Sequence, residues 1–153
     1  LELSGQVEID TLLVSVGGGG LIGGILSHYQ NDLRVISVET ELTASLAPSR
    51  DKGEQVSIIP SGISASGLGA SAIGDRGWAA AQEWLDGHVV VSDADTFEAQ
   101  RRLWEASRIV VEPSAATALA ALTAAAYVPE KDERVAVLLC GGNAEPDWFT
   151  QKD

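Results

Sequence analysis

The sequence predicts an α/β fold in which a mostly parallel sheet carries helices on both faces. Short apolar runs rich in β-branched residues recur along the chain, and stretches with helical character, many of them rich in alanine, separate them. Strands that are apolar throughout are typical of parallel sheets buried on both sides. The length of 153 residues suffices for one such domain and is too short for two.

Four strands and four helices are expected. The strands are Thr11–Val16, Arg34–Glu39, Val89–Val91 and Val135–Leu139. The helices are Leu21–Tyr29, Asp75–Leu85, 93–107 and the alanine-rich run 115–126. Ser92 and Asp95 have the spacing of a capping box, and Ser114 is the expected N-cap of the alanine-rich helix.

Two other stretches carry weaker signals. Phe97, Gln100 and Trp104 form one stripe along the helix that follows Ser92, and we expect the stripe to pack into the core. The segment Ala47–Gly69 is rich in serine, glycine and proline, and we expect an irregular functional loop there.

The charge balance excludes some classes of partner. Ten basic residues stand against 22 acidic ones, which gives a net charge of −12. Such a chain does not neutralise a phosphate backbone or dock on an anionic membrane, so neither nucleic acid nor membrane is an expected partner. No apolar run approaches the ~20 residues of a membrane helix. The single Cys140 suits a reducing compartment, and we expect a cytoplasmic location.

The beginning of the chain suggests a part of a larger protein. The sequence contains no methionine and opens at Leu1 in a polar stretch. No basic-then-apolar leader is visible there. We expect a piece of a longer chain rather than the product of processing.

Four consecutive glycines, Gly17–Gly20, follow the first strand and precede a helix. Glycine lets the backbone turn sharply and expose successive N–H groups, and the helix adds the positive end of its dipole. This arrangement predicts a cradle for a phosphate, held by backbone dipoles because no lysine or arginine is near in sequence. The alternative is a tight turn with no ligand. A Walker-type loop is excluded because no Gly-Lys-Ser/Thr follows.

A dinucleotide site is a second interpretation of the same stretch. Gly18, Gly20 and Gly23 fit G-x-G-x-x-G, and Glu39 ends the next strand about twenty residues on, where it could bind a ribose. This motif alone is weak support for a nicotinamide- or nucleotide-binding module.

A second glycine motif follows the last expected strand. Cys140 is followed by Gly141, Gly142 and Asn143 at the carboxyl end of that strand. Ligands of open α/β sheets bind at this edge, so we expect Cys140 and the first glycine loop to border one cleft. The alternative for Cys140 is a small buried apolar side chain.

Together these motifs resemble a known family. The stretches GGGGL, ISVE, IVVEPSAATALAAL and VLLCGGN occur in the order typical of the second half of the fold-type-II pyridoxal-phosphate enzymes, of which the threonine/serine dehydratases (ammonia-lyases) are most similar. The resemblance covers residues 8–147. It implies a tryptophan synthase β-like fold, with residues 1–153 forming the C-terminal part of the large cofactor-binding domain.

The resemblance also implies roles for individual residues. The thiol of Cys140 would face the pyridine nitrogen, and Glu112 would lie near the ring. A neutral thiol there does not hold the ring protonated, which suits elimination better than deep carbanion chemistry. The cofactor-binding residues implied are Gly17, Gly18, Gly19, Gly20 and Leu21 for the phosphate, and Gly67, Glu112 and Cys140 for the remainder.

The activity implied is pyridoxal 5'-phosphate-dependent β-elimination of L-threonine or L-serine to a 2-oxo acid and ammonia. The full-length parent is expected to bind a small amino acid and to form a homodimer. Three alternatives stay open: another fold-type-II lyase, synthase or racemase; a nicotinamide- or nucleotide-binding module; and a non-catalytic fragment that keeps only the phosphate cradle.

The chain departs from the family pattern in several places. Ser66 replaces an aspartate and Ala115 a glycine. Some relatives bind a divalent cation with the glutamate at Glu39 and an aspartate six positions on, where this chain has Ser45. We therefore expect no metal site, and a polar contact for Glu39 at the strand end.

The largest departure is the missing catalytic lysine. The family's reaction needs a lysine that forms a Schiff base with the cofactor, and it lies in the first half of relatives. Lys52, Lys131 and Lys152 all sit in charged, turn-like sequence and are expected at the surface. We therefore expect no catalytic residue in this chain and no activity of the chain alone. His28 and His88 lack partners at metal or triad spacing, and each is expected to be structural or exposed.

Overall fold

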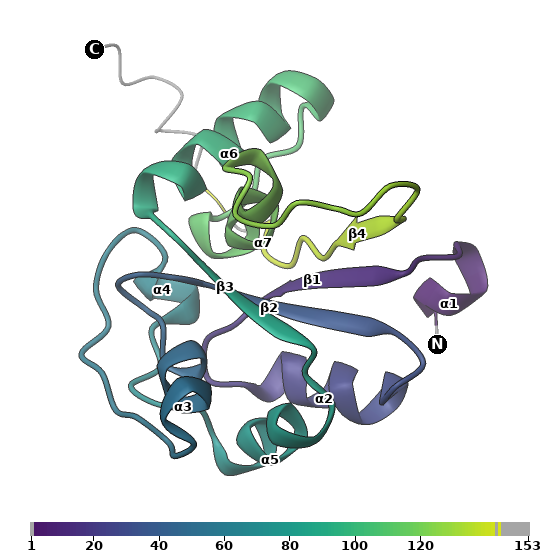
Figure 1. Ribbon diagram of the computed structural model, residues 1–153. Helices are drawn as coiled ribbons and strands as arrows, with labels where there is room; N and C mark the ends of the chain where they lie inside the picture. Colours follow the sequence, from purple (N-terminus) through teal and green to yellow (C-terminus); the bar gives the residue numbers. More distant parts are fainter. Residues whose placement is uncertain (1, 143, 145–153) are drawn as a thin grey trace.

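Four strands form one sheet in the computed structural model, which describes residues 2–142 and 144. They are β1 (Thr11–Ser15), β2 (Arg34–Thr40), β3 (Gly87–Val91) and β4 (Val135–Val137), in the order β3-β2-β1-β4 (Figure 1). Every neighbouring pair is parallel, with Leu13 of β1 in register with Ile36 and Val137. The predicted sheet is confirmed.

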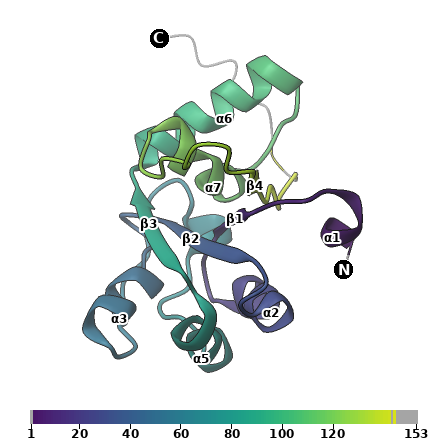
Figure 2. The same cartoon turned by 45° about the vertical axis from the view of Figure 1, so that its right-hand side comes forward.

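Helices cover both faces of this sheet (Figures 1 and 2). The helices of one face are α6 (Asp93–Ser107) and α7 (Pro113–Thr123), and those of the other are α2 (Gly20–Tyr29), α3 (Leu46–Lys52) and α5 (Asp75–Trp84). The short helices are α1 (Glu2–Gln6) and α4 (Ala65–Leu68). The two-sided α/β architecture predicted from the apolar strands is therefore confirmed.

The side chains of β1 explain how one strand serves two cores. Successive side chains of a strand point to opposite faces. Leu12 and Val14 pack in the cluster with α2 and α5, whereas Leu13 packs in the cluster with α7. All five residues of β1 are buried, as expected of a central strand covered on both sides.

The start of α6 matches its sequence signal, and the start of α7 does not. Ser92 Oγ accepts from the N–H of Asp95 at 3.1 Å and the N–H of Ser92 donates to Asp95 Oδ2 at 3.0 Å, which completes the capping box. Glu112, not Ser114, is the N-cap of α7, because Pro113 takes the first helical position, where its fixed φ fits and its missing N–H costs nothing.

Three further expectations need correction. The last strand ends at Val137, two residues early, and α3 and α4 lie in the stretch expected to be irregular. The stripe on α6 is only partly buried. Gln100 is 2% exposed and donates to the carbonyl of Val111 at 2.8 Å, but Phe97 is 45% exposed. Ala99 of α6 instead packs in one cluster with the alanines of α7, whose small side chains allow close approach.

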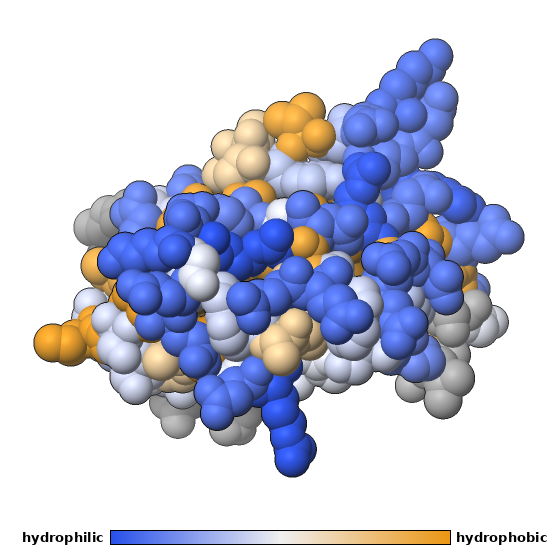
Figure 3. Space-filling view, turned by 60° about the horizontal axis from the view of Figure 1, so that its bottom comes forward, coloured by the Kyte–Doolittle hydropathy of each residue, from blue (hydrophilic) through white to orange (hydrophobic). Residues whose placement is uncertain are grey.

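The outer surface over α2, α3 and α5 is largely hydrophilic, with apolar side chains scattered across it (Figure 3). Scattered apolar residues are normal on a protein surface. Within the described ranges, no helix combines the length and the apolar character needed to cross a membrane.

Candidate functional site

The glycine loop turns the chain from β1 into α2. Gly19 has φ of 84°, the left-handed region that glycine adopts without steric cost. A β-carbon on Gly19 would also stand 2.2 Å from the side chain of Ile73. Glycine is therefore favoured here by the turn, and a larger residue would also require the side chain of Ile73 to move.

The loop carries a row of backbone N–H groups that donate to no carbonyl in the described part of the chain. The first N–H group after the loop that donates to a backbone carbonyl is that of Gly23, which donates to the carbonyl of Gly19 at 2.9 Å. Among the residues that the structure describes, the N–H groups of Gly17 through Leu21 have no acceptor. Unpaired N–H groups at the start of a ten-residue helix form a binding site for an anion, favoured by the helix dipole.

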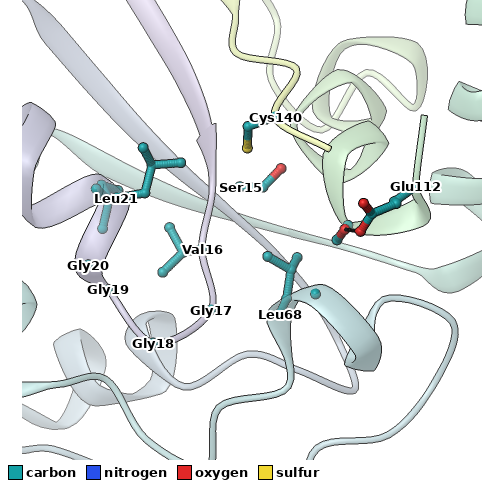
Figure 4. A pocket seen from close by; sticks show the side chains of 13 residues that line it. Ser15, Val16, Gly17, Gly18, Gly19, Gly20, Leu21, Leu68, Glu112 and Cys140 are labelled. Carbon is teal, nitrogen blue, oxygen red and sulfur yellow. Dashed lines mark hydrogen bonds between the residues drawn. The ribbon is translucent and has the colours of Figure 1, made fainter. Parts of the chain in front are cut away.

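These glycines line a pocket of about 250 Å³ at the carboxyl edge of the sheet (Figure 4). The pocket lies there because β1 and β4 are adjacent and parallel, so the segments that follow them emerge side by side. The expected shared cleft of Cys140 and the glycine loop is thereby confirmed. The residues lining it are Ser15, Val16, Gly17, Gly18, Gly19, Gly20, Leu21, Ile22, Gly67, Leu68, Glu112, Ser114 and Cys140.

Glu112 joins the start of α7 to the segment after β4. Its N–H donates to the carbonyl of Gly141 at 2.9 Å, and its carboxylate accepts from Ser114 Oγ at 3.2 Å. Gly67 must be small, since a β-carbon on it would lie 2.4 Å from that hydroxyl oxygen. Glu112, Ser114 and Gly67 thus form one wall of the pocket.

Cys140 is exposed, and its thiol is held in the neutral form. Partial burial raises the pKa of the thiol above its ordinary 9.0, and the negative charge of Glu112 raises it further. A neutral thiol is a weak hydrogen-bond donor and a poor nucleophile. This side chain therefore suits contact with a ligand atom rather than covalent chemistry.

Of the five pocket residues that sequence reasoning missed, Ser15 and Ser114 carry hydroxyl groups, and the others are Val16, Ile22 and Leu68. Ser114 was expected as a helix cap, and its hydroxyl instead contacts Glu112. Ser15 carried a usable signal, because it is the only hydroxyl residue in the otherwise apolar run 12–16 that leads into the glycine loop.

Glu39 lies away from the pocket and cannot hold a ribose. Its side chain is fully buried, and its two oxygens accept from the N–H groups of Ser45, Leu46 and Ala47 at 2.7–2.9 Å. Burial raises the pKa of Glu39, although these hydrogen bonds oppose the change. The predicted polar contact is confirmed, and the dinucleotide interpretation loses the residue it depended on.

The lysines that the structure describes, Lys52 and Lys131, do not line this pocket. Lys52 is exposed at the end of α3, and Lys131 lies among acidic residues on another part of the surface. Lys152 and Asn143 lie outside the described residues. Across 2–142 and 144, no cluster of three or more histidine, cysteine, aspartate or glutamate side chains could hold a metal ion.

An anion cradle beside a neutral donor, at the carboxyl edge of a parallel sheet, is the arrangement expected of an α/β domain that binds a phosphorylated small molecule. Residues 1–141 match the model of the pyridoxal-phosphate dependent enzymes. The chain belongs to this family, whose cofactor is pyridoxal phosphate. The backbone N–H groups for a phosphate and the small polar wall fit that cofactor.

Individual relatives agree with the family. The chain is 34% identical to a biosynthetic L-threonine dehydratase of Haemophilus influenzae, over 94% of this chain and 29% of that protein. It is 30% identical to a serine racemase of Arabidopsis thaliana, over 95% and 46%.

Among solved structures, the processed form of threonine deaminase isoform 2 from Solanum lycopersicum superposes with a TM-score of 0.88 at 26% identity. That match covers 98% of this chain and 45% of the other. Maize serine racemase gives 0.86 at 28% identity, over 98% and 48%. The chain therefore spans less than half of the length of these relatives.

Proposed function

We propose that the chain is the phosphate- and ring-binding part of an L-threonine/L-serine dehydratase, which converts its amino acid to a 2-oxo acid and ammonia. Pyridoxal phosphate, when bound, supplies an electron-accepting ring for chemistry at the α-carbon of an amino acid. The glycine loop holds the phosphate, and Cys140 and Glu112 contact the ring. The Schiff-base lysine is supplied from outside residues 1–153, so these residues form the C-terminal part of the large domain.

One observation carries this proposal. The N–H groups of Gly17 through Leu21 have no acceptor among the described residues, and they border the same pocket as Cys140. A phosphate satisfies those donors, and the neutral thiol leaves the ring nitrogen unprotonated. A weaker electron sink favours elimination, which needs less stabilisation of a carbanion.

The relatives favour a dehydratase over a racemase. The threonine dehydratases of Haemophilus influenzae and Escherichia coli are 34% and 35% identical to the chain, and the serine racemases of Arabidopsis and rice are 30% and 29% identical.

Gly20 offers a direct test of the phosphate cradle. A β-carbon on Gly20 meets no atom within 4 Å, so a side chain fits without a clash. An aspartate at this first helical position favours the helix but repels a phosphate. Gly20→Asp should bind pyridoxine 5'-phosphate at least about ten-fold more weakly than Gly20→Asn, its neutral isostere. The two side chains occupy nearly the same space, so the difference measures the repulsion between the carboxylate and the phosphate.

The binding is measured by protection of the single Cys140 against alkylation, and the fold of each variant by circular dichroism. Equal affinities of the aspartate and asparagine variants would show that the phosphate does not bind at the glycine loop.

Activity is tested by joining residues 1–141 to the part of the Haemophilus influenzae dehydratase that the chain does not cover. We expect 2-oxobutyrate and ammonia from L-threonine. Production of D-allothreonine from L-threonine, or of D-serine from L-serine, would instead show that the parent enzyme is a racemase.

A further inference from the structure

Ser15 is a buried hydroxyl in a strand that is otherwise mostly apolar. It ends β1, is 3% exposed and lines the pocket. Its Oγ accepts from the N–H of Ala118 in α7 at 2.9 Å. This hydrogen bond crosses from the sheet to the helix and fixes the position of the oxygen.

The proton of this hydroxyl has no acceptor within residues 2–142 and 144. A serine hydroxyl offers one donor and two lone pairs, and the N–H of Ala118 uses one of the lone pairs. No described residue accepts from Ser15, including Cys140 and Glu112, which line the same pocket. An unpaired buried donor is unfavourable, so the group is expected to donate to a molecule in the pocket.

The location of Ser15 indicates which part of a ligand it meets. In Figure 4 its oxygen lies between the sulfur of Cys140 and the carboxylate of Glu112, and the glycine loop runs along the other side of the pocket. Phosphate-binding groups and ring-binding groups therefore occupy different sides. Ser15 belongs to the side with Cys140, where it adds a stronger donor than a thiol.

We propose that Ser15 is a further ligand-binding residue, whose hydroxyl donates to an acceptor atom on the aromatic ring of the bound cofactor. This assignment rests on the proposed function of the pocket. Ala118 holds the oxygen in place before the ligand enters, so little freedom is lost on binding. Two donors, the hydroxyl of Ser15 and the thiol of Cys140, then meet the same end of the ring.

The test compares two ligands on the full chain. Pyridoxine 5'-phosphate carries the ring and the phosphate but has no aldehyde, so its binding requires no lysine. Ser15→Ala should weaken its Kd about three- to ten-fold, the effect of losing one neutral hydrogen bond. The Kd of inorganic phosphate should stay within about two-fold, because the glycine loop alone binds it.

Ser37 provides a matched control. It is a buried serine at the centre of the adjacent strand β2, and it does not line the pocket. Ser37→Ala should leave both Kd values unchanged. Ser15→Cys, with a weaker donor in nearly the same volume, should bind pyridoxine 5'-phosphate with an affinity between those of Ser15→Ala and the unsubstituted chain.

The possible failures are distinguishable. If Ser15→Ala binds pyridoxine 5'-phosphate as tightly as the unsubstituted chain, a water takes the proton and the assignment of Ser15 is overturned, while the cofactor pocket stands. Equal weakening for inorganic phosphate would show that Ser15 only ties β1 to α7, and it too would overturn the assignment. If the unsubstituted chain binds neither ligand, the proposed function falls together with the role of Ser15.

Discussion

A β-carbon on Gly17 would stand 2.8 Å from the α-carbon of Leu68. The glycine loop and α4 therefore touch backbone to backbone, although about fifty residues separate them in sequence. This contact places α4, and with it Gly67, against the rim of the pocket. The glycine loop and the wall of the pocket that contains Gly67 are joined through it.

Gly17→Ala should disturb this contact. The added methyl group meets backbone that cannot rotate away, and overpacking of this kind costs about 1–3 kcal/mol of unfolding free energy. We expect a lower midpoint in urea denaturation. Gly20→Ala is the control, because the added methyl group is in open space and alanine favours a helix, so stability should stay equal or rise. Equal stability of both variants would contradict the contact.

Glu39 should be essential for the loop after β2. Glu39→Ala leaves the N–H groups of Ser45, Leu46 and Ala47 buried without an acceptor, and we expect a loss of about 3 kcal/mol in unfolding free energy. Glu41→Ala, at an exposed position two residues on, should change it by less than about 0.5 kcal/mol. Denaturant titration measures both. A Glu39 variant as stable as the Glu41 variant would show that the three hydrogen bonds contribute nothing.

The charge of Glu112 should set the reactivity of the only thiol. Glu112 raises the pKa of Cys140, so Glu112→Gln removes part of that increase and leaves more thiolate at pH 8. We expect alkylation by iodoacetamide to become about two- to three-fold faster. Glu83→Gln on the exposed side of α5 should leave the rate unchanged. An alkylation rate that is the same in Glu112→Gln and in the unsubstituted chain would show that the charge of Glu112 does not influence Cys140.

Because of the lowered pKa of Asp10, we expect the free energy of unfolding to depend on pH. Hydrogen bonds from Arg134 lower its pKa from 3.8 to about 2. Because the folded-state pKa is the lower one, the stabilising contribution is complete above pH 3.8 and is lost as the pH falls towards 2. Asp10→Asn should flatten the dependence of unfolding free energy on pH within this window. An unchanged slope would show that the pair with Arg134 does not persist in solution.

The fold could be predicted because its signals are local. The apolar run of β1 and the capping box at Ser92 each act within a few residues, and the structure follows both. The cap of α7 failed because two local signals competed there. Pro113 and Ser114 both mark a helix start, and the proline fixes the first position.

The site could be predicted only in part, because some of its residues are placed by contacts between segments that are distant in sequence. The glycine loop and Cys140 are visible as motifs, but Ser15 becomes a pocket residue only because the amide of Ala118 holds it there. Contacts across more than a hundred residues leave no periodicity in the sequence. The same holds for Leu68, whose approach to Gly17 depends on the path of the loop between β2 and α5.

The chain alone should bind the cofactor weakly and show no activity. In the proposed function, a catalytic lysine must reach the carbonyl of a cofactor whose phosphate binds at the glycine loop, and neither Lys52 nor Lys131 lines that pocket. After incubation with pyridoxal phosphate and reduction with borohydride, we expect no lysine to carry a stoichiometric label, and no ammonia from threonine or serine. Lys52→Arg and Lys131→Arg measure the background at exposed amines. Stoichiometric labelling of one lysine, abolished by its arginine variant and accompanied by ammonia release, would place the catalytic base inside this chain.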